Sequence, residues 1–250
     1  MLYKNSPLIL IQILLLSGSL FSQEKIKARL ADDYFSKYSF VEAVPIYQDL
    51  AMRNEKNSHY VSRTAECYRL TGNTAKAEEW YAKLVNTENA NPNDILMYAE
   101  MLEENKKYGE AQKYLSLYNE KSGTDSRGKR KVGNAEKQIN SLYLDSANYM
   151  VENASFNSEN SDFGLFPFGE KSFFFSSNRK NEKEKYVKHI HNWNNQPFLD
   201  LYTVKKNGAG DFLSPEPMPG EMNSQYHEGP IFFEKNTNTF YITFYYANKN

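Results

Sequence analysis

Histidine is the residue whose spacing in this sequence comes closest to that of a metal site. His189 and His191 are two residues apart, Trp193 follows them, and His227 comes later in the chain. Alternating positions on a strand place both imidazoles on one face, as a zinc site requires. The surrounding segment, residues 179–198, contains no Cys or Asp that could complete a ligand set. The pattern favours surface histidines, and we assign no metal and no cofactor.

Three other side chains have the chemistry of an acid, a base or a nucleophile. Asp162 and Glu228 begin corresponding strand-like segments, and this repetition favours carboxylates that accept hydrogen bonds from backbone N–H groups. Cys67 is the only cysteine, and no histidine stands at a matching spacing in its repeat, so we expect a packed thiol. The sequence has no nucleophile elbow, phosphate-binding glycine loop or zinc-protease helix. We therefore predict no catalytic residue and no enzyme within these residues.

The segment around Cys67 repeats with a period of 34 residues, in which two small and two large positions recur. The small residues are Ala31, Ala65 and Ala99, and Ala43, Ala77 and Ala111; the large ones are Tyr47, Tyr81 and Leu115, and Leu50, Leu84 and Tyr118. This is the tetratricopeptide (TPR) pattern, in which small residues let two helices approach and large ones fill the space between hairpins. The alternative, an ordinary helical bundle, does not explain the regular register. We predict three TPR units over residues 23–125, forming an α-solenoid.

The predicted solenoid needs a cap over its last apolar surface. After the polar stretch "NEKSGTDSRG", Val132, Ala135, Ile139 and Leu142 fall on one helical face. We predict a capping helix and linker over residues 126–150.

The first helix of each TPR unit is expected to line a concave binding surface. It carries an acidic residue at one equivalent position and a mixed residue three positions later. These candidate partner-binding residues are Asp32, Glu66 and Glu100, and Phe35, Arg69 and Glu103. An acidic stripe would select a basic segment of a partner protein, whereas the alternative is an ordinary solvated helix face.

The N-terminus is typical of an exported protein. Lys4 precedes the apolar run "PLILIQILLLSGSLF", which is too short to cross a bilayer and suits a signal-peptide core. We predict a signal peptide over residues 1–22, with a buried N-terminal helix as the alternative. The mature part shows no second apolar stretch of membrane-spanning length and no lipid-attachment cysteine after the signal. A formal net charge of −1 argues against a nucleic-acid partner.

The last part of the chain, residues 151–250, changes to short aromatic runs bounded by Gly, Asn and Pro. "KSFFFSS", "FLDLYTVKK", "GPIFFEK" and "TFYITFYY" are predicted strands. Aligning Gly164 with Gly229 and Phe173 with Phe240 gives two copies, which is typical of β-propeller blades. We predict about two blades of an incomplete propeller, with residues 179–198 as an inserted loop and further blades beyond residue 250. A small sandwich is the alternative.

The order of parts resembles that of Bacteroidetes OmpA-family proteins of type IX secretion and gliding machinery, the PorE-like group. The phrases that carry this resemblance are "SDFG", "FFFSSNR", "FLDLY" and "MNSQYHEGPIFF", together with the signal and the TPR units. The resemblance implies a non-catalytic periplasmic scaffold associated with the outer membrane, whose protein partners include an outer-membrane β-barrel and secretion components. In that family peptidoglycan is bound by a C-terminal OmpA-like domain, which is absent here, so no residue of this chain is assigned that role.

Two other classes of function stay open from the sequence. A propeller can precede a serine peptidase of the prolyl-oligopeptidase type, whose catalytic domain would lie beyond residue 250. An exported helical-repeat protein could also capture glycans as SusD-like proteins do, although the lipid-attachment cysteine expected there is missing.

Overall fold

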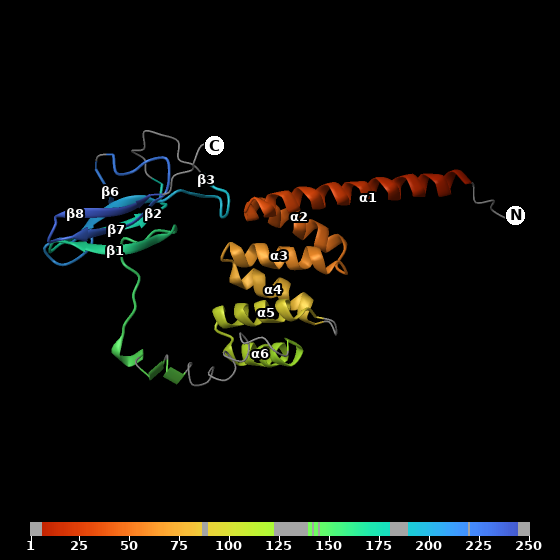
Figure 1. Cartoon of the computed structure of the whole chain (residues 1–250), viewed down its shortest axis with the longest axis horizontal. Coiled ribbons are helices and arrows are strands. Elements are labelled where there is room, and N and C mark those ends of the chain that lie inside the picture. The colour runs from red at the N-terminus through yellow and green to blue at the C-terminus, as the bar shows by residue number, and fades with distance from the viewer. Residues whose placement is uncertain are drawn as a thin grey trace. The chain divides into compact units, whose positions relative to one another are not determined.

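A computed structural model describes residues 7–86, 90–122, 140–141, 143–144, 146–180, 190–219 and 221–244, with side chains from residue 22 onward. The chain divides into two compact units, Met1–Ala147 and Asn148–Asn250. The described part of the first is helical and that of the second consists of strands and loops (Figure 1). No helix in these ranges is both long and apolar enough to cross a membrane.

The first unit is a six-helix TPR-like region in which consecutive helices pack as antiparallel hairpins (Figure 1). Its described helices are α1 (Pro7–Ser36), α2 (Phe40–Arg53), α3 (Ser58–Leu70), α4 (Thr74–Val85), α5 (Pro92–Glu104) and α6 (Tyr108–Ser122). Helix α1 runs without interruption through the predicted cleavage point after Ser22. The predicted capping residues 132, 135, 139 and 142 lie outside the described residues.

The turn inside each hairpin repeats with the same 34-residue period. Tyr38, Gly72 and Lys106 all have positive φ, of 60°, 78° and 63°. The next residue in each turn donates its N–H five residues back: Ser39 to Tyr34, Asn73 to Tyr68 and Lys107 to Leu102. This is the bond pattern of a Schellman helix end, which satisfies the last carbonyls of the first helix. Two of the three turns use a residue other than glycine, so the shared geometry is not visible as a glycine repeat.

The core of the helical unit consists of the predicted small and large positions. The six alanines that recur in the sequence are at most 1% exposed, and Tyr47, Tyr81 and Leu115 are likewise buried. An alanine at each helix crossing leaves room for the neighbouring backbone, and the large residues fill the space between hairpins. The predicted repeat core is confirmed.

The second unit contains a four-stranded antiparallel sheet in the order β1-β2-β5-β6. Its strands are β1 (Asp162–Phe168), β2 (Ser172–Ser177), β5 (Asp200–Lys205) and β6 (Glu216–Pro217). Two separate hairpins are formed by β3 (Ile190–His191) with β4 (Gln196–Pro197), and by β7 (Glu228–Glu234) with β8 (Thr239–Phe244). A short 3-10 helix, Ser146–Asn148, spans the point in the sequence at which the first unit ends and the second begins. Within the described residues the strands form small antiparallel sheets and no closed ring.

The two central strands of this sheet, β2 and β5, are covered on both faces. On one face Phe175, Tyr202 and Val204 pack against Phe156, with Phe212 beside them. On the other face a second cluster joins the sheet to the β7–β8 hairpin: Phe174, Leu201, Met218 and Ile231, with Phe168, Met222, Phe240 and Ile242 packed against it. Successive phenylalanines of β2 therefore serve two different cores, because side chains alternate across a strand.

The four predicted strands are confirmed as β2, β5, β7 and β8. Phe173 and Phe240 are both second residues of their strands, as aligned, but Gly164 is the third residue of β1 and Gly229 the second of β7. Relative to the strand pairing, however, the two glycines are equivalent as aligned, because each is the first residue of the register shift, between Phe163 and Phe166 in β1 and between Glu228 and Ile231 in β7. Strand β6 was not predicted, since it lies in a proline-rich connection. Of the predicted insertion, residues 181–189 lie outside the described residues.

The segments that lead into β1 and β7, here called the strand entries, contain the same side-chain motif. Ser158 donates its N–H (2.6 Å) and its hydroxyl (2.8 Å) to Asp162. Ser224 donates its N–H (3.1 Å) and its hydroxyl to Glu228 in the same way. The predicted structural role of the two acidic residues is confirmed. The signal in the sequence is Asn-Ser-x-x-x-Asp/Glu, repeated 66 residues apart.

Asp162 also forms a buried ion pair. The Arg179 guanidinium donates to its carboxylate at 2.6 Å, and the two side chains are 15% and 5% exposed, respectively. Burial alone would raise the pKa of Asp162, but hydrogen bonds from Arg179, Ser177 and Ser158 outweigh it and hold the pKa below its usual value. Arg179 also donates to the carbonyl of Phe156 at 3.1 Å, which ties the covering segment to the sheet.

We predict that Asp162→Asn lowers the free energy of unfolding of the second unit by about 3 kcal/mol, because it leaves a buried guanidinium without its counter-charge. The lowered folded pKa means that this stabilisation is present above about pH 4 and is lost as the pH falls through the folded pKa. Hydrogen exchange of the β2 and β5 amides in increasing urea, at neutral and acid pH, measures both effects. Glu170→Gln, in an exposed turn, is the control, and equal stability of the two variants at neutral pH would contradict the prediction.

Candidate functional site

Helices α1, α3 and α5 place the six predicted partner-binding residues at equivalent points of successive hairpins. In the first two hairpins the acidic residue accepts a hydrogen bond from the second helix of its own hairpin. Tyr47 donates its hydroxyl to Asp32 at 2.6 Å, and Tyr81 donates to Glu66 at 2.7 Å. Both pairs are fifteen residues apart and join the first helix of a hairpin to the second. In the third hairpin Leu115 stands at the position of this tyrosine.

Glu66 accepts hydrogen bonds from Arg69 as well as from Tyr81. Arg69 donates to it twice, at 3.0 Å and 2.6 Å, in a bidentate pair. Burial alone would raise the pKa of Glu66, but hydrogen bonds from Arg69 and Tyr81 hold it below its ordinary value. Burial, followed by the bond to Glu66, raises the pKa of Tyr81 far above physiological pH, so its hydroxyl stays a donor. Glu66 and Arg69 are thus committed to each other, while Glu103 and Glu100 are half-buried on α5.

Phe35 contacts Arg63, a residue that was not predicted as part of a site. The Arg63 guanidinium lies 4.2 Å from the centre of the Phe35 ring, which joins α3 to α1. Guanidinium groups stack on aromatic faces and keep their N–H donors at the edge available. Close by, His59 lies 3.5 Å from Asp32, an ion pair when the imidazole is protonated.

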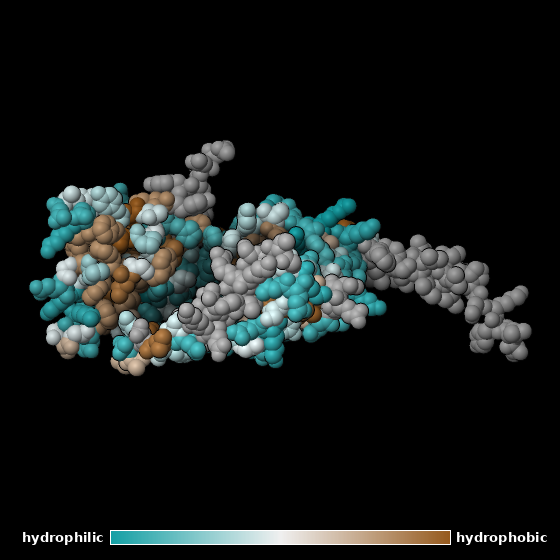
Figure 2. Space-filling view, turned by 60° about the horizontal axis from the view of Figure 1, so that its bottom comes forward, coloured by the Kyte–Doolittle hydropathy of each residue, from teal (hydrophilic) through white to brown (hydrophobic). Residues whose placement is uncertain are grey.

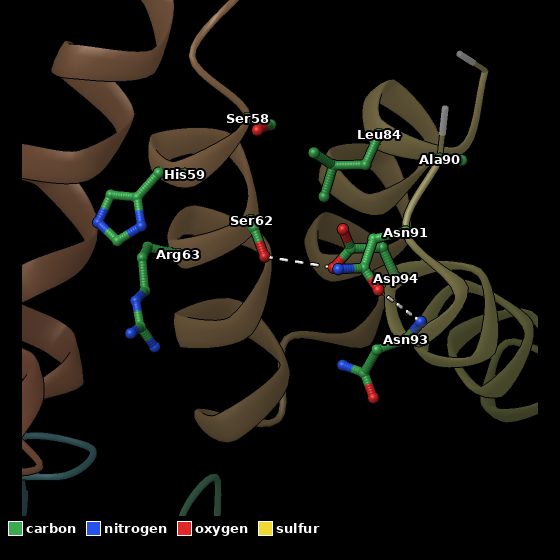
Figure 3. Close-up of a pocket in the computed structure, with 9 residues that line it drawn as sticks. All are labelled: Ser58, His59, Ser62, Arg63, Leu84, Ala90, Asn91, Asn93 and Asp94. Atoms are coloured by element: carbon green, nitrogen blue, oxygen red, sulfur yellow. Dashed lines mark hydrogen bonds between the residues drawn. The ribbon is translucent and has the colours of Figure 1, made fainter. Parts of the chain in front are cut away.

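Arg63 and His59 line a pocket of about 390 Å³ between α3 and α5 (Figure 3). In the figure both side chains project from one side of α3, and Ser62 points from the other side towards Asp94 of α5. The Ser62 hydroxyl donates to Asp94 at 3.3 Å. The pocket is lined by Ser58, His59, Ser62, Arg63, Leu84, Ala90, Asn91, Asn93 and Asp94.

The two helices that form the pocket begin in the same way. Asn57 accepts the N–H of His59 at 3.1 Å, and Asn91 accepts that of Asn93 at 2.9 Å. Asparagine is a favoured N-cap, and these two stand 34 residues apart. This repetition, like that of Arg29 and Arg63, was present in the sequence and could have directed attention to the first turns. The predicted positions of α3 and α5 lie nine and twelve residues after these asparagines, about two and a half to just over three helical turns further along.

The histidines of the second unit are arranged around aromatic rings. The His227 ring stacks on Phe198 at 3.9 Å between centroids, and His191 lies 5.4 Å from His227. The Leu199 N–H donates to Nδ1 of His227 at 3.0 Å, so neutral His227 carries its proton on Nε2. His189 lies outside the described residues, and among the residues that are described no three His, Cys, Asp or Glu side chains gather around a possible metal position.

Several solved structures are similar to part of this chain, including the following two. The TPR domain of Sgt2 from Aspergillus fumigatus is 14% identical with a TM-score of 0.42, covering 55% of this chain and 91% of that one. The Yersinia enterocolitica type III secretion translocator chaperone SycD is 16% identical with a TM-score of 0.38, covering 51% and 95%. No protein-family model and no curated protein matches the chain.

We predict that Tyr81→Phe lowers the free energy of unfolding of the helical unit by about 2 kcal/mol, because it removes a hydrogen bond to a half-buried carboxylate. Urea unfolding followed by far-ultraviolet circular dichroism measures the change. Tyr114→Phe is the matched control, since Tyr114 contacts the ring of Tyr98 and keeps that contact as phenylalanine. A Tyr81→Phe chain as stable as the control would show that the bond contributes nothing.

Cys67 is fully buried, and burial raises the pKa of its thiol to about 12. We predict that the folded protein reacts with a thiol reagent such as DTNB at least roughly a hundredfold more slowly than the urea-unfolded protein, because the thiolate is scarce and covered. Release of the coloured product measures both rates. Equal rates would indicate an accessible, activated cysteine.

Proposed function

We propose that this protein is a non-catalytic adaptor that binds a partner protein along the first helices of its TPR-like unit and a second partner through its β unit. The observation that carries the proposal is the α3–α5 pocket, which lies beside the Phe35–Arg63 stack on the first helices of two hairpins. A polar groove on a stiff helical stack suits an extended protein segment. In contrast, the side chains with catalytic potential have structural roles: Cys67 is buried, and Asp162 and Glu228 hold strand entries.

We further propose that the β unit is the beginning of a β-propeller. Asn223, in the second copy of the strand-entry motif, accepts the N–H of Leu201 at 2.8 Å and donates to its carbonyl at 3.0 Å. The second copy is thereby fastened to the preceding sheet. Asn157 is the equivalent residue of the first copy, and it is exposed.

The outer face of the last hairpin supports the same proposal. Phe232 and Tyr241 face each other across β7 and β8 and are 50% and 56% exposed. Hydrophobic residues reach the surface of the β unit (Figure 2). A further sheet would cover this face as β7 and β8 cover the first sheet.

The cellular setting is proposed from the sequence. The signal-peptide pattern supports export to the periplasm, and the resemblance to the OmpA family of Bacteroidetes supports association with the outer membrane in type IX secretion or gliding. Two alternatives are a propeller-containing peptidase, whose catalytic domain would lie outside these residues, and a SusD-like glycan-capture protein.

An affinity pull-down of the tagged full-length protein from detergent-solubilised envelopes tests the adaptor, with partners identified by mass spectrometry. We expect an outer-membrane β-barrel and secretion components to be recovered. We also expect Glu100→Gln with Glu103→Gln to reduce recovery several-fold if the acidic part of α5 contacts the partner. Glu79→Gln, on the exposed side of α4, is the control. Recovery of no partner, together with peptidase activity or glycan binding in the purified protein, would contradict the proposal.

A further inference from the structure

Arg63 and Asp94 are two charges that the fold brings near one pocket without pairing either with an opposite charge. Arg63 has the Phe35 ring as its close partner, at 4.2 Å. Asp94 has the hydroxyl of Ser62, at 3.3 Å. No ion pair of either side chain occurs within the part of the chain that the structure describes.

The nearest alternative partners are occupied by other groups. Glu66 stands one helical turn after Arg63, but its carboxylate accepts two hydrogen bonds from Arg69 and one from Tyr81. On the other side, Asp32 accepts the hydroxyl of Tyr47 and lies 3.5 Å from His59. The edge of the Arg63 guanidinium is therefore available to a carboxylate of a partner protein.

Asp94 differs from the carboxylates of α1 and α3. Burial raises its pKa, and the single bond from Ser62 lowers it too little to compensate. A half-buried carboxylate of this kind is stabilised by the arrival of a cation, whereas Glu66 already has one. Asp94 thus suits a lysine or arginine of a ligand.

The two charges lie on opposite sides of α3 (Figure 3). Arg63 projects towards α1, where it stacks on Phe35, and Asp94 belongs to α5 on the other side. Arg63 thus lies between α3 and α1, and Asp94 lies between α3 and α5. The two charges are therefore separated by about one spacing between neighbouring helix axes, roughly 10 Å. An extended chain rises about 3.3 Å per residue, so about three residues span this distance.

We propose that this surface binds an extended segment of a partner protein that presents a glutamate or aspartate to Arg63 and, about three residues away, a lysine or arginine to Asp94. The guanidinium fork matches a carboxylate in a bidentate fashion. The inference rests on the proposed adaptor function and names the charge pattern of the partner. It replaces the uniformly basic partner that an acidic stripe alone would select, since Asp32 and Glu66 are engaged within the fold.

The probe is a phage-displayed library of random dodecapeptides selected on the immobilised full chain. We expect enriched peptides to pair an acidic with a basic residue two to four positions apart, a spacing that follows from the extended-chain rise of about 3.3 Å per residue. Selection on Arg63→Gln should lose the acidic preference, and selection on Asp94→Asn should lose the basic one. Arg53→Gln is the control, because Arg53 lies on α2 in an exposed pair with Asp49, and it should select the wild-type pattern.

One enriched peptide, acetylated and amidated to remove its end charges, then gives the affinity by fluorescence anisotropy. We expect Arg63→Gln to weaken binding about tenfold, equivalent to about 1.4 kcal/mol. A peptide with glutamine in place of its acidic residue should bind both proteins equally. Circular dichroism melting confirms that the variants are folded.

Three outcomes would overturn the inference: no enrichment over the bare support, enriched peptides without the charge pair, or the same peptides selected by all variants. The adaptor proposal is tested separately by the envelope pull-down. A partner recovered equally by wild type and Arg63→Gln would leave the adaptor standing and remove this charge pattern. Selection of charge-paired peptides together with an empty pull-down would support the charge pattern and remove the adaptor proposal.

Discussion

An alanine at the crossing of each helix pair is the constraint on which the helical unit depends. Ala31, Ala65 and Ala99 are completely buried, so any larger side chain there would push the helices of a hairpin apart. With the backbones this close, a tyrosine on the second helix reaches the carboxylate on the first, as Tyr81 reaches Glu66. The same closeness fixes the direction in which the first helices present their remaining side chains. The Phe35–Arg63 stack and the pocket lie between successive hairpins, on first helices that each carry one of these buried alanines.

The β unit depends on a different constraint, the burial of the charged Asp162 carboxylate. Asp162 is held by Ser158 and by Arg179, and Arg179 in turn reaches the carbonyl of Phe156. One ion pair thereby joins the strand entry, the end of β2 and the segment that covers one face of the sheet. The second copy keeps the serine–carboxylate part of this device with Ser224 and Glu228. It adds a side-chain clamp from Asn223 to Leu201, which links one sheet to the next.

The sequence predicted the parts of the fold that depend on period and apolar patterning. The helical core followed from residues such as Ala65 and Tyr81, because a 34-residue register leaves few other ways to bury them. Strand β6 was missed because two residues in a proline-rich stretch carry no periodic signal. The candidate site involves the first helices that the sequence analysis singled out, but none of the six predicted residues lines the pocket. A carboxylate of the acidic stripe can accept a hydrogen bond from a side chain fifteen residues later, as Glu66 does from Tyr81. The acidic residues alone did not reveal this interaction. Arg63 was missed because its role depends on a ring from another helix.

Site-specific photo-crosslinking in living cells tests most directly whether the first-helix surface is where a partner protein binds. A photoreactive phenylalanine analogue would replace Asn93, which lines the pocket and is exposed, and Glu79, which is exposed on α4, in separate chains. The adaptor account predicts a discrete crosslinked protein from position 93 and none from position 79, and loss of that product on adding Arg63→Gln. The same crosslinks from both positions, or none from position 93 in a chain that is folded and produced normally, would contradict it.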